Sequence, residues 1–463
     1  MSPHIIPLTP RTVVSSGLCI GCGSCVAGAP ASAGAQMGFN RDGHFQPTGA
    51  RDWMNAPTRE FAQTCPFSPR AANEDQLAAS LFPAALAHDA SIGRFETAYV
   101  GWVEEADYRS RGSSGGLVSW VAAELLKEGL VDAVAHVAPV EDPRGDGRFF
   151  RYTLSRTETD LRAGAKSRYY PVEMSDLLAQ IRAAPGRYAV VGVPCFIKAI
   201  QLLRRHDPVL RERIVFTLGL FCGHMKSARF VESFAWQMGV AVEEVQSVEF
   251  RLKDPSRAAN IYTAQLSLYD GRVLRRDWWN LVDGDWGAGF FQNSACNFCD
   301  DVVGETADIS FGDAWVEPYS SDGRGTNVIV VRSPVLRDIV HSAIEDGRLH
   351  LESVDAAFVE ATQAAGFRQR REGLSYRLSW PRVGIAPRKR VPARAGLRSK
   401  RRRAIYRMRA FITFGSHLTF RWARRLGKPE IYLRWAKTSV AVYHGFAYAR
   451  GPFGKFLEKW GLK

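Results

Sequence analysis

The chain has 463 residues, of which 46% are hydrophobic and 23% charged, values that are ordinary for a globular protein. This composition excludes a disordered, collagen-like or coiled-coil chain, and the length predicts two or three domains. The formal net charge is +14, but residues 381–463 alone carry 22 Lys and Arg against two acids, so a mildly acidic body precedes a basic segment.

The first 90 residues lack long periodic runs and are rich in Gly, Ala, Pro and Cys, which predicts a small loop-rich module. Strands and helices are then expected to alternate, which is typical of an α/β domain with a largely parallel core. The apolar patterns predict strands at 98–103, 131–140, 188–193 and 214–222, and helices at 117–130, 196–205 and 227–239.

Residues 245–275 favour antiparallel strands, with Asp270-Gly271 as a hairpin turn. Two further strands are expected within ADISFGDAW and TNVIVVRS, at residues 307–315 and 326–333. The body is expected to end near Trp380. We find no internal repeat.

Neither a spanning helix nor a secretory signal is predicted. The longest apolar candidate near the end, residues 410–420, is too short to cross a bilayer. The first twenty residues lack the order of basic and then apolar residues that marks a signal peptide. We therefore expect a cytoplasmic protein with reduced thiols, in which eight cysteines indicate metal binding or catalysis before disulfides.

The first cysteines, Cys19, Cys22 and Cys25, have C-x2-C-x2-C spacing. This spacing lets a turning backbone direct several thiolates at one cuboidal cluster. Gly21 and Gly23 between them permit the tight turn and leave N–H groups for the sulfurs. The pattern is typical of bacterial ferredoxins, although a zinc site or plain buried thiols would also use such residues.

The fourth ligand of this set has to come from elsewhere in the chain. Bacterial ferredoxins have a further Cys before Pro, but here that position is Ala29, followed by Pro30. The natural completion is Cys65, which precedes Pro66. The sequence therefore predicts one [4Fe-4S] cluster with the ligands Cys19, Cys22, Cys25 and Cys65.

The other four cysteines are scattered. Cys195 and Cys222 each follow the carboxyl end of a predicted strand, and parallel strands bring those ends to one edge of the sheet. The C-x2-C pair Cys296 and Cys299 would complete four ligands there. Four thiolates suit a second [4Fe-4S] cluster or a structural zinc ion, and unrelated thiols are the third interpretation.

A phosphate-binding loop is expected between the strand at 98–103 and the helix that follows. The chain has neither a G-x-G-x-x-G fingerprint after its first strand nor a P-loop. Residues 111–116 read RGSSGG, in which Ser113 and Ser114 are expected to cap the helix and Gly115 and Gly116 to permit close backbone approach. An ordinary helix cap is the simpler interpretation.

Taken together, these blocks resemble the beta-subunit family of coenzyme F420 hydrogenase/dehydrogenase, where F420 is a deazaflavin cofactor. The resemblance covers residues 18–332. It rests on CIGCGSC with the later CP, SSGGLVSWVAAELLKEGLVDAV, KSRYYP, VVGVPCFIKAI, LFCGHMKS, CNFCDD and ISFGDAWVEPYSSDGRGTNVIVVR. The family includes F420-reducing hydrogenase and formate dehydrogenase subunits and 7-hydroxymethyl chlorophyll a reductase-like proteins.

The resemblance implies an FAD-dependent iron–sulfur oxidoreductase with two clusters. It thereby favours a cluster at Cys195, Cys222, Cys296 and Cys299. The same resemblance makes two segments FAD-contact candidates, in which basic side chains would meet phosphate and Tyr169 would stack on a ring. These candidates are Ser113, Ser114, Gly115, Gly116, Lys166, Ser167, Arg168 and Tyr169.

Two residues are catalytic candidates. Family members often have histidine directly after the cysteine of the LFC block, whereas this chain has Gly223 and then His224. His224 would protonate a substrate near the flavin, because imidazole titrates near neutrality. Asp313 in FGDAW is a candidate acid. The simpler interpretations are a loop histidine and a turn aspartate.

The expected architecture is α/β, α+β overall, in three parts. Residues 1–90 would form a ferredoxin-like [4Fe-4S] module, 91–380 a mixed-sheet FAD-binding domain with the second cluster, and 381–463 a basic helical extension rich in aromatic residues. The resemblance does not cover this extension. Its mixture of Arg, Trp, Tyr and Phe suits the surface of an anionic membrane, a partner protein or a solvated tail, and nucleic acid less well.

We therefore expect an oxidoreductase that passes electrons between a ferredoxin-type donor or acceptor and an organic substrate through the clusters and FAD. One alternative is an F420-dependent dehydrogenase or hydrogenase beta subunit, with coenzyme F420 as a substrate. Another is a non-catalytic electron-transfer subunit that docks through the basic residues 381–463. The expected partners are ferredoxin or a redox subunit, in the cytoplasm or peripherally on the cytoplasmic membrane face.

Overall fold

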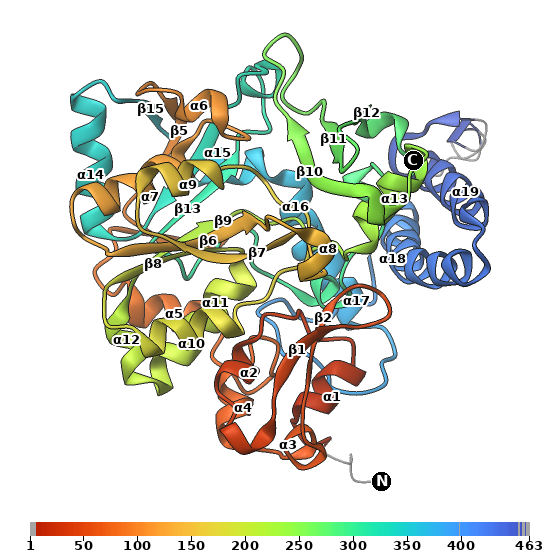
Figure 1. The fold of residues 1–463 in the computed structure, drawn as a ribbon, viewed down its shortest axis with the longest axis horizontal. Helices are drawn as coiled ribbons and strands as arrows, with labels where there is room; N and C mark the ends of the chain where they lie inside the picture. The colour runs from red at the N-terminus through yellow and green to blue at the C-terminus, as the bar shows by residue number, and fades with distance from the viewer. Residues whose placement is uncertain (1–5, 398, 452–453, 456–458, 460–463) are drawn as a thin grey trace.

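The computed structural model describes residues 6–397, 399–451, 454–455 and 459 (Figure 1). The N-terminal module contains α1 (Pro10–Ser15), α2 (Ser24–Ala27), β1 (Gln36–Phe39), β2 (Phe45–Thr48), α3 (Arg51–Asn55), α4 (Arg59–Thr64) and α5 (Glu74–Leu81). As its composition predicts, this module consists of short elements joined by loops.

The central domain follows, with elements at the predicted strands and helices and several others between them. Its first half contains β3 (Ala87–Asp89), β4 (Gly93–Phe95), β5 (Thr97–Val103), α6 (Tyr108–Arg111), α7 (Leu117–Lys127), β6 (Ala133–Pro139), α8 (Pro143–Asp146), β7 (Phe150–Ser155), α9 (Glu158–Ala163), α10 (Ser175–Ala183), β8 (Tyr188–Gly192), α11 (Pro194–His206), α12 (Pro208–Arg213) and β9 (Ile214–Leu220).

The second half contains α13 (Arg229–Gln237), β10 (Val245–Leu252), β11 (Thr263–Leu268), β12 (Val273–Asp277), β13 (Ile309–Asp313), β14 (Asn327–Val331), α14 (Pro334–Glu345) and β15 (Leu349–Ser353). The chain ends in helices, namely α15 (Ala356–Thr362), α16 (Ala364–Arg370), α17 (Glu372–Leu378), α18 (Lys400–Leu426) and α19 (Pro429–Tyr448).

An eight-stranded mixed sheet in the order β15-β5-β14-β13-β9-β8-β6-β7 forms the centre of the fold. The middle strands β13, β9, β8 and β6 run parallel to one another, as the alternation of strands and helices predicts. The flanks differ, because β14, β5 and β15 on one side and β7 on the other pair antiparallel. β10, β11 and β12 form a separate antiparallel sheet.

Both faces of the central sheet are covered by helices (Figure 1). Along β8, Ala189 and Val191 pack in a cluster with α7 and α14, whereas Tyr188 and Val190 pack in another cluster with α10 and α11. Successive side chains of a strand point to opposite faces, so a continuous apolar run such as YAVVG indicates burial on both sides. The carboxyl ends of β8 and β9 are thereby fixed in the interior.

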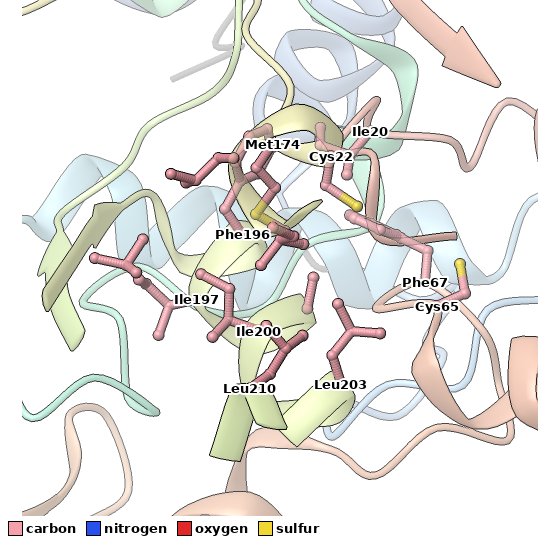
Figure 2. Packing of buried hydrophobic residues seen from close by; sticks show 14 of the residues in the cluster. Ile20, Cys22, Cys65, Phe67, Met174, Phe196, Ile197, Ile200, Leu203 and Leu210 are labelled. Atoms are coloured by element: carbon pink, nitrogen blue, oxygen red, sulfur yellow. The ribbon is translucent and has the colours of Figure 1, made fainter. Parts of the chain in front are cut away.

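The N-terminal module packs against the α10–α11 face of the sheet. Figure 2 shows Cys22 and Cys65 of the module beside Ile20 and Phe67, in the same buried cluster as Phe196 of α11. A backbone hydrogen bond of 3.0 Å from Met174 N to Cys22 O joins the two parts. The module therefore shares one apolar core with the central domain.

The basic segment after residue 380 is packed onto the body rather than solvated as a tail. Helices α18 and α19 lie side by side (Figure 1), and Ile412, Phe420 and Tyr432 are buried in a cluster with α13 and β10. The segment is helical, as expected, and its last residues lie outside the described part of the chain. Within the described residues, no helix is long and apolar enough to span a bilayer.

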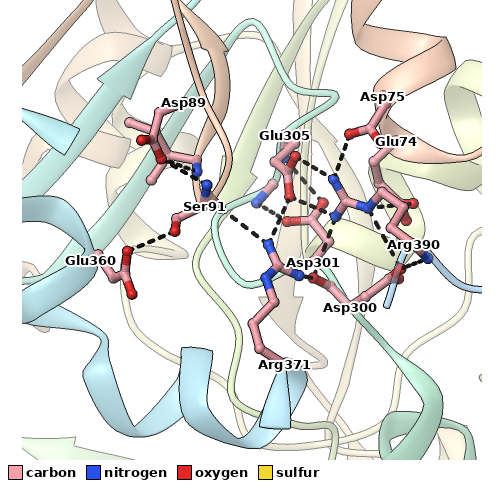
Figure 3. A network of polar contacts seen from close by, with 12 residues as sticks. Glu74, Asp75, Asp89, Ser91, Asp300, Asp301, Glu305, Glu360, Arg371 and Arg390 are labelled. Atoms are coloured by element: carbon pink, nitrogen blue, oxygen red, sulfur yellow. Dashed lines mark hydrogen bonds and ion pairs between the residues drawn. The ribbon is translucent and has the colours of Figure 1, made fainter. Parts of the chain in front are cut away.

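Arg390, in the loop before α18, joins three parts of the chain (Figure 3). Its guanidinium forms two hydrogen bonds of 2.7 Å with the buried carboxylate of Glu305 and one of 2.8 Å with Asp75 of the N-terminal module. Its backbone N–H donates to Asp300 at 3.1 Å, and Lys389 pairs with the same carboxylate at 3.3 Å. Asp300 directly follows Cys299, so these contacts hold the CNFCDD loop.

A buried pair of histidines also connects the two ends of the chain. The Nε2 atoms of His44, next to β2, and His417, on α18, lie 3.3 Å apart, and His417 Nε2 lies 3.2 Å from Gln292 O. Burial lowers the pKa of both rings, and the charge of Arg229 lowers the pKa of His44 further. The negative charge of Asp42 acts in the opposite direction on the pKa of His417.

Replacing Arg390 with Met is expected to lower the free energy of unfolding by about 3–5 kcal/mol, because Glu305 and Asp300 would keep buried charges without this partner. The measurement is urea denaturation. Arg388→Met is the matched control, since Arg388 is exposed two residues earlier and should change stability by less than about 0.5 kcal/mol. Equal stabilities of the two variants would contradict the importance of the Arg390 network.

The histidine pair predicts a loss of stability in acid. Below the ordinary histidine pKa of 6.5 the unfolded chain binds more protons than the folded chain, because the folded pKa values are lowered. The free energy of unfolding should therefore fall with pH, by up to about 1.4 kcal/mol per pH unit for each ring. Denaturation at pH 7.5 and 5.5 tests this. His44→Gln should reduce the slope, whereas His341→Gln at an exposed site on α14 should not.

Candidate functional site

The first four cysteines surround one cavity in the N-terminal module. Cys19 follows α1, Cys25 lies in α2 and Cys65 ends α4. Together with Cys22 they line one pocket. The rest of the wall is mainly apolar and includes Val13, Leu18, Ile20, Phe61 and Phe67. The triplet and the distant CP motif thus meet in space.

The tight turn between these cysteines requires glycine. Gly21 and Gly23 have φ values of +79° and +84°, in the left-handed region that other residues rarely adopt. A Cβ atom at Gly21 would lie 2.6 Å from Phe45 O, and one at Gly23 would lie 2.6 Å from a carboxylate oxygen of Glu173. The left-handed backbone and the close contacts with Phe45 and Glu173 therefore both explain why CIGCGSC has glycine at these two positions.

The other four cysteines surround a second cavity. Cys195 lies in the first turn of α11, directly after β8, and Cys222 follows the neighbouring strand β9. Cys296 and Cys299 arrive on the loop that precedes β13. Met225 N donates to Cys296 Sγ at 3.3 Å. The predicted convergence at the carboxyl ends of parallel strands is therefore present.

Arg370 of α16 lines this second cavity and was not expected from the sequence. The residue is 4% exposed, and its Nη2 donates to Cys222 O at 2.8 Å and Gly223 O at 2.7 Å. Its Nε and Nη1 atoms are buried without a hydrogen-bond partner among the described residues. A buried cation of this kind favours an anionic group inside the ring of thiols. RQRRE gives no sequence signal that singles out Arg370.

The two cavities share a wall. Ile20, between Cys19 and Cys22, and Phe67, two residues after Cys65, line both spaces. The apolar cluster that contains them also contains every cysteine except Cys222. The two sets of thiols are therefore neighbours, separated by single side chains.

Burial opposes ionisation of these thiols. It raises the pKa of Cys65 to about 12, with a further contribution from Cys22, and that of Cys296 to about 12. It raises the pKa of Cys222 to about 11, although the charge of Arg370 opposes the shift. Thiolates at these positions therefore require a positively charged partner. In the described part of the chain, no three His, Cys, Asp or Glu side chains are arranged to hold a single metal ion.

The RGSSGG loop lies at the start of α7, but its serines do not cap that helix. Ser114 Oγ donates to Thr326 O at 2.8 Å, and Ser113 Oγ accepts a 2.8 Å hydrogen bond from Ser167 N. The first N–H group of α7, that of Leu117, instead reaches the side-chain oxygen of Asn327 at 3.2 Å. The expected cap was wrong because a residue far along the chain supplies it. The hydrogen bond between Ser113 and Ser167 joins the two candidate FAD segments.

The two glycines of the loop allow close packing. Gly116 has a φ of +89°, and a Cβ atom at Gly115 would lie 2.8 Å from Gly101 O. A side chain at Gly115 would therefore clash with the sheet, and one at Gly116 would clash with Tyr108 of α6.

Basic side chains gather beside this loop. Arg168 pairs with Glu249 at 3.4 Å, and Lys253 Nζ donates to Ser114 O at 2.7 Å and Arg324 O at 2.6 Å. Burial lowers the pKa of Lys253 to about 7, and the nearby charge of Lys166 lowers it further. Burial likewise lowers the pKa of Lys166. Mutual repulsion of these cations favours a bound anion.

Lys253 was not among the sequence candidates. Lys253 is the last residue of FRLK, at the end of an expected strand, and this sequence pattern does not indicate a binding residue.

Aromatic rings connect this region to His224. The ring of Tyr169 lies 4.8 Å from that of Trp286, which stacks on His224 at 4.1 Å. Burial lowers the pKa of His224, and its Nε2 is buried without a hydrogen-bond partner within the described residues.

The other catalytic candidate, Asp313, ends β13 and pairs with the buried Arg251 through two hydrogen bonds, of 2.9 and 3.3 Å. That carboxylate is therefore occupied by an ion pair.

Comparison with protein families identifies the chain. Residues 98–179 match the N-terminal model, and residues 186–357 the C-terminal model, of the coenzyme F420 hydrogenase/dehydrogenase beta subunit. Together the two matches span more than half of the chain. The chain belongs to this family. The matched region contains the RGSSGG loop, the KSRYYP segment and the second set of cysteines, while the first set and α18–α19 lie outside it.

Curated relatives of this F420 hydrogenase/dehydrogenase family member include two uncharacterized proteins of Methanocaldococcus jannaschii. They are 24% and 22% identical to this chain over 253 residues. Each match covers 53% of this chain, and the matches cover 64% of the first relative and 84% of the second. The chain thus matches less than two thirds of the length of the first relative. A chain of the F420-reducing NiFe hydrogenase complex from Methanosarcina barkeri is 17% identical with a TM-score of 0.48, over 64% of this chain and 96% of that one.

Proposed function

We propose that this chain is an iron–sulfur flavoprotein oxidoreductase with two [4Fe-4S] clusters and FAD. The observation that carries the proposal is the pair of neighbouring cavities, each lined by four cysteines and sharing the side chains of Ile20 and Phe67. Two neighbouring redox centres would provide a continuous route for electrons. Membership of the F420 hydrogenase/dehydrogenase beta-subunit family supports the same class of chemistry.

The donor sets fit iron–sulfur clusters. Four thiolates are the usual ligands of a [4Fe-4S] cluster, and each cavity offers four cysteine sulfurs in an apolar wall. The first set would consist of Cys19, Cys22, Cys25 and Cys65, and the second of Cys195, Cys222, Cys296 and Cys299. In the second set Arg370 would balance part of the negative charge, because its free Nε and Nη1 atoms are buried beside the thiols.

FAD, when bound, supplies the exchange between one-electron and two-electron steps. The candidate residues for its diphosphate are the loop Ser113–Gly116 with Lys166, Ser167 and Arg168, and Lys253 is a further one. The chemistry of this set fits, because half-buried cations lie close together beside a glycine-rich helix start. Tyr169 and Trp286 would offer aromatic surface, and they already contact each other.

His224 stays our candidate for proton transfer to or from an organic substrate, since its Nε2 is buried and has no hydrogen-bond partner among the described residues. Asp313 is proposed to hold Arg251 in place, because proton donation would require breaking a bidentate ion pair. We further propose ferredoxin or a partner redox subunit as the electron partner, and peripheral contact of residues 381–463 with the cytoplasmic membrane face.

A second candidate function is the oxidation or reduction of coenzyme F420 within a larger assembly. It is favoured by the description of the matching family, a hydrogenase or dehydrogenase beta subunit. Hydride exchange between purified protein and F420 would distinguish it from turnover of another organic substrate.

Cysteine variants test the clusters. Protein purified without oxygen should contain about eight iron atoms per chain, and Cys65→Ser and Cys195→Ser should each lose about half of them. Metal analysis and electron paramagnetic resonance of the reduced protein provide the measurement, and each variant serves as the control for the other. A colourless protein, or zinc in place of iron, would contradict the proposal. Clusters without flavin would instead support an electron-transfer subunit.

Lys166→Met tests the flavin site. Within the described residues Lys166 forms no side-chain hydrogen bond, so the substitution removes a charge and little else. FAD affinity should fall at least about tenfold, as expected for one charge-assisted hydrogen bond. Titration of flavin-free protein with FAD measures this, and Lys166→Arg should restore most of the affinity. Lys127→Met, at the other end of α7, is the control, and equal affinities of Lys166→Met and wild type would refute the assignment.

A further inference from the structure

Helix α18 presents a row of exposed apolar side chains on one face. Phe411, Phe414 and Trp422 are exposed and, with the half-buried Leu418 between them, follow one another at intervals of three and four residues, which places them on one stripe of the helix. Side chains between them, such as Ile412, are buried against the body. The helix is therefore fixed on its inner side and apolar on its outer side.

The outer row is unusual in its extent. The exposed fractions are 53% for Phe411, 67% for Phe414, 51% for Trp422 and 55% for Leu426 at the end of the helix. Single exposed apolar residues are common on protein surfaces, but a contiguous row of large ones indicates a binding surface.

Cations without an acidic partner flank this row, although Arg407 also donates a hydrogen bond to Tyr376 Oη at 2.9 Å. Arg407 and Arg425 lie on the same stripe, before and after the aromatic residues, and both are exposed. In the part of the chain that the structure describes, Arg425, Lys428, Arg434 and Lys437 form no ion pair with an acidic side chain. Glu430 is the single acidic residue of α18 and α19. The surface is therefore complementary to a dense negative charge beside an apolar layer.

We propose that this outer face of α18 lies in the plane of an anionic lipid bilayer. Phe411, Phe414 and Trp422 would enter the boundary between headgroups and acyl chains, while Arg407 and Arg425 contact lipid phosphates. The row lies along a single helix, which suits a helix that lies in the plane of a lipid surface. This inference rests on the proposed peripheral membrane contact and is independent of the cofactors.

Sedimentation of the full chain with vesicles tests the proposal. Vesicles of phosphatidylcholine containing phosphatidylglycerol should carry the protein into the pellet, and phosphatidylcholine alone should carry at least about tenfold less. Added salt should weaken the binding, because part of it is electrostatic. Failure to pellet with either vesicle, or equal pelleting with both, would overturn the proposal. Iron and flavin measured in the same samples report separately on the redox function.

Variants test which face makes the contact. Phe411→Ser combined with Phe414→Ser should reduce binding to anionic vesicles at least about tenfold and leave the thermal midpoint unchanged, since both side chains are exposed. Trp422→Ser should weaken binding in the same direction. Trp279→Ser is the matched control, because Trp279 is 63% exposed on the body, and it should bind like wild type. Undiminished binding of the double variant would refute the assignment of this face.

Discussion

The apolar contact that Ile20 and Phe67 make with both cysteine cavities ties the N-terminal module to the central sheet. Ile20 lies between Cys19 and Cys22, while Phe67 follows Cys65, so the module's own cysteine motif builds the wall of the second cavity. Because the same cluster includes Phe196 of α11, the position of one set of thiols depends on the packing of the other. A shift of the module would open both sites.

The segments outside the family match complete the central domain. Arg370 of α16 supplies a buried positive charge to the second cavity, and Arg390 holds the loop that carries Cys296 and Cys299. Helix α18 buries Phe420 against the body and connects with the N-terminal module through His417. A family core of strands and helices is thus enclosed by residues from both ends of the chain.

The sequence predicted much of the fold because its strongest signals come from burial. The run YAVVG indicates a strand covered on both sides, and that strand fixes where Cys195 lies. Contacts between distant residues were not predictable: Asn327 replaces the serines of RGSSGG as the cap of α7, and Arg370 lies in a run of basic residues that gives no pattern. The composition of the last 83 residues indicated helices and aromatic surface, but not that one face of α18 belongs to the core.

The contact of Arg390 with Asp300 and Glu305 has a consequence for biosynthesis. Asp300 follows Cys299 directly and Glu305 lies six residues after it, whereas Lys389 and Arg390 are translated about ninety residues later. Lys198 and Arg332 already act on the charges of this loop before Arg390 is translated, so Lys389 and Arg390 add the last counter-charges to it. The contacts of Lys389 and Arg390 with this loop can therefore form only once most of the polypeptide has been made.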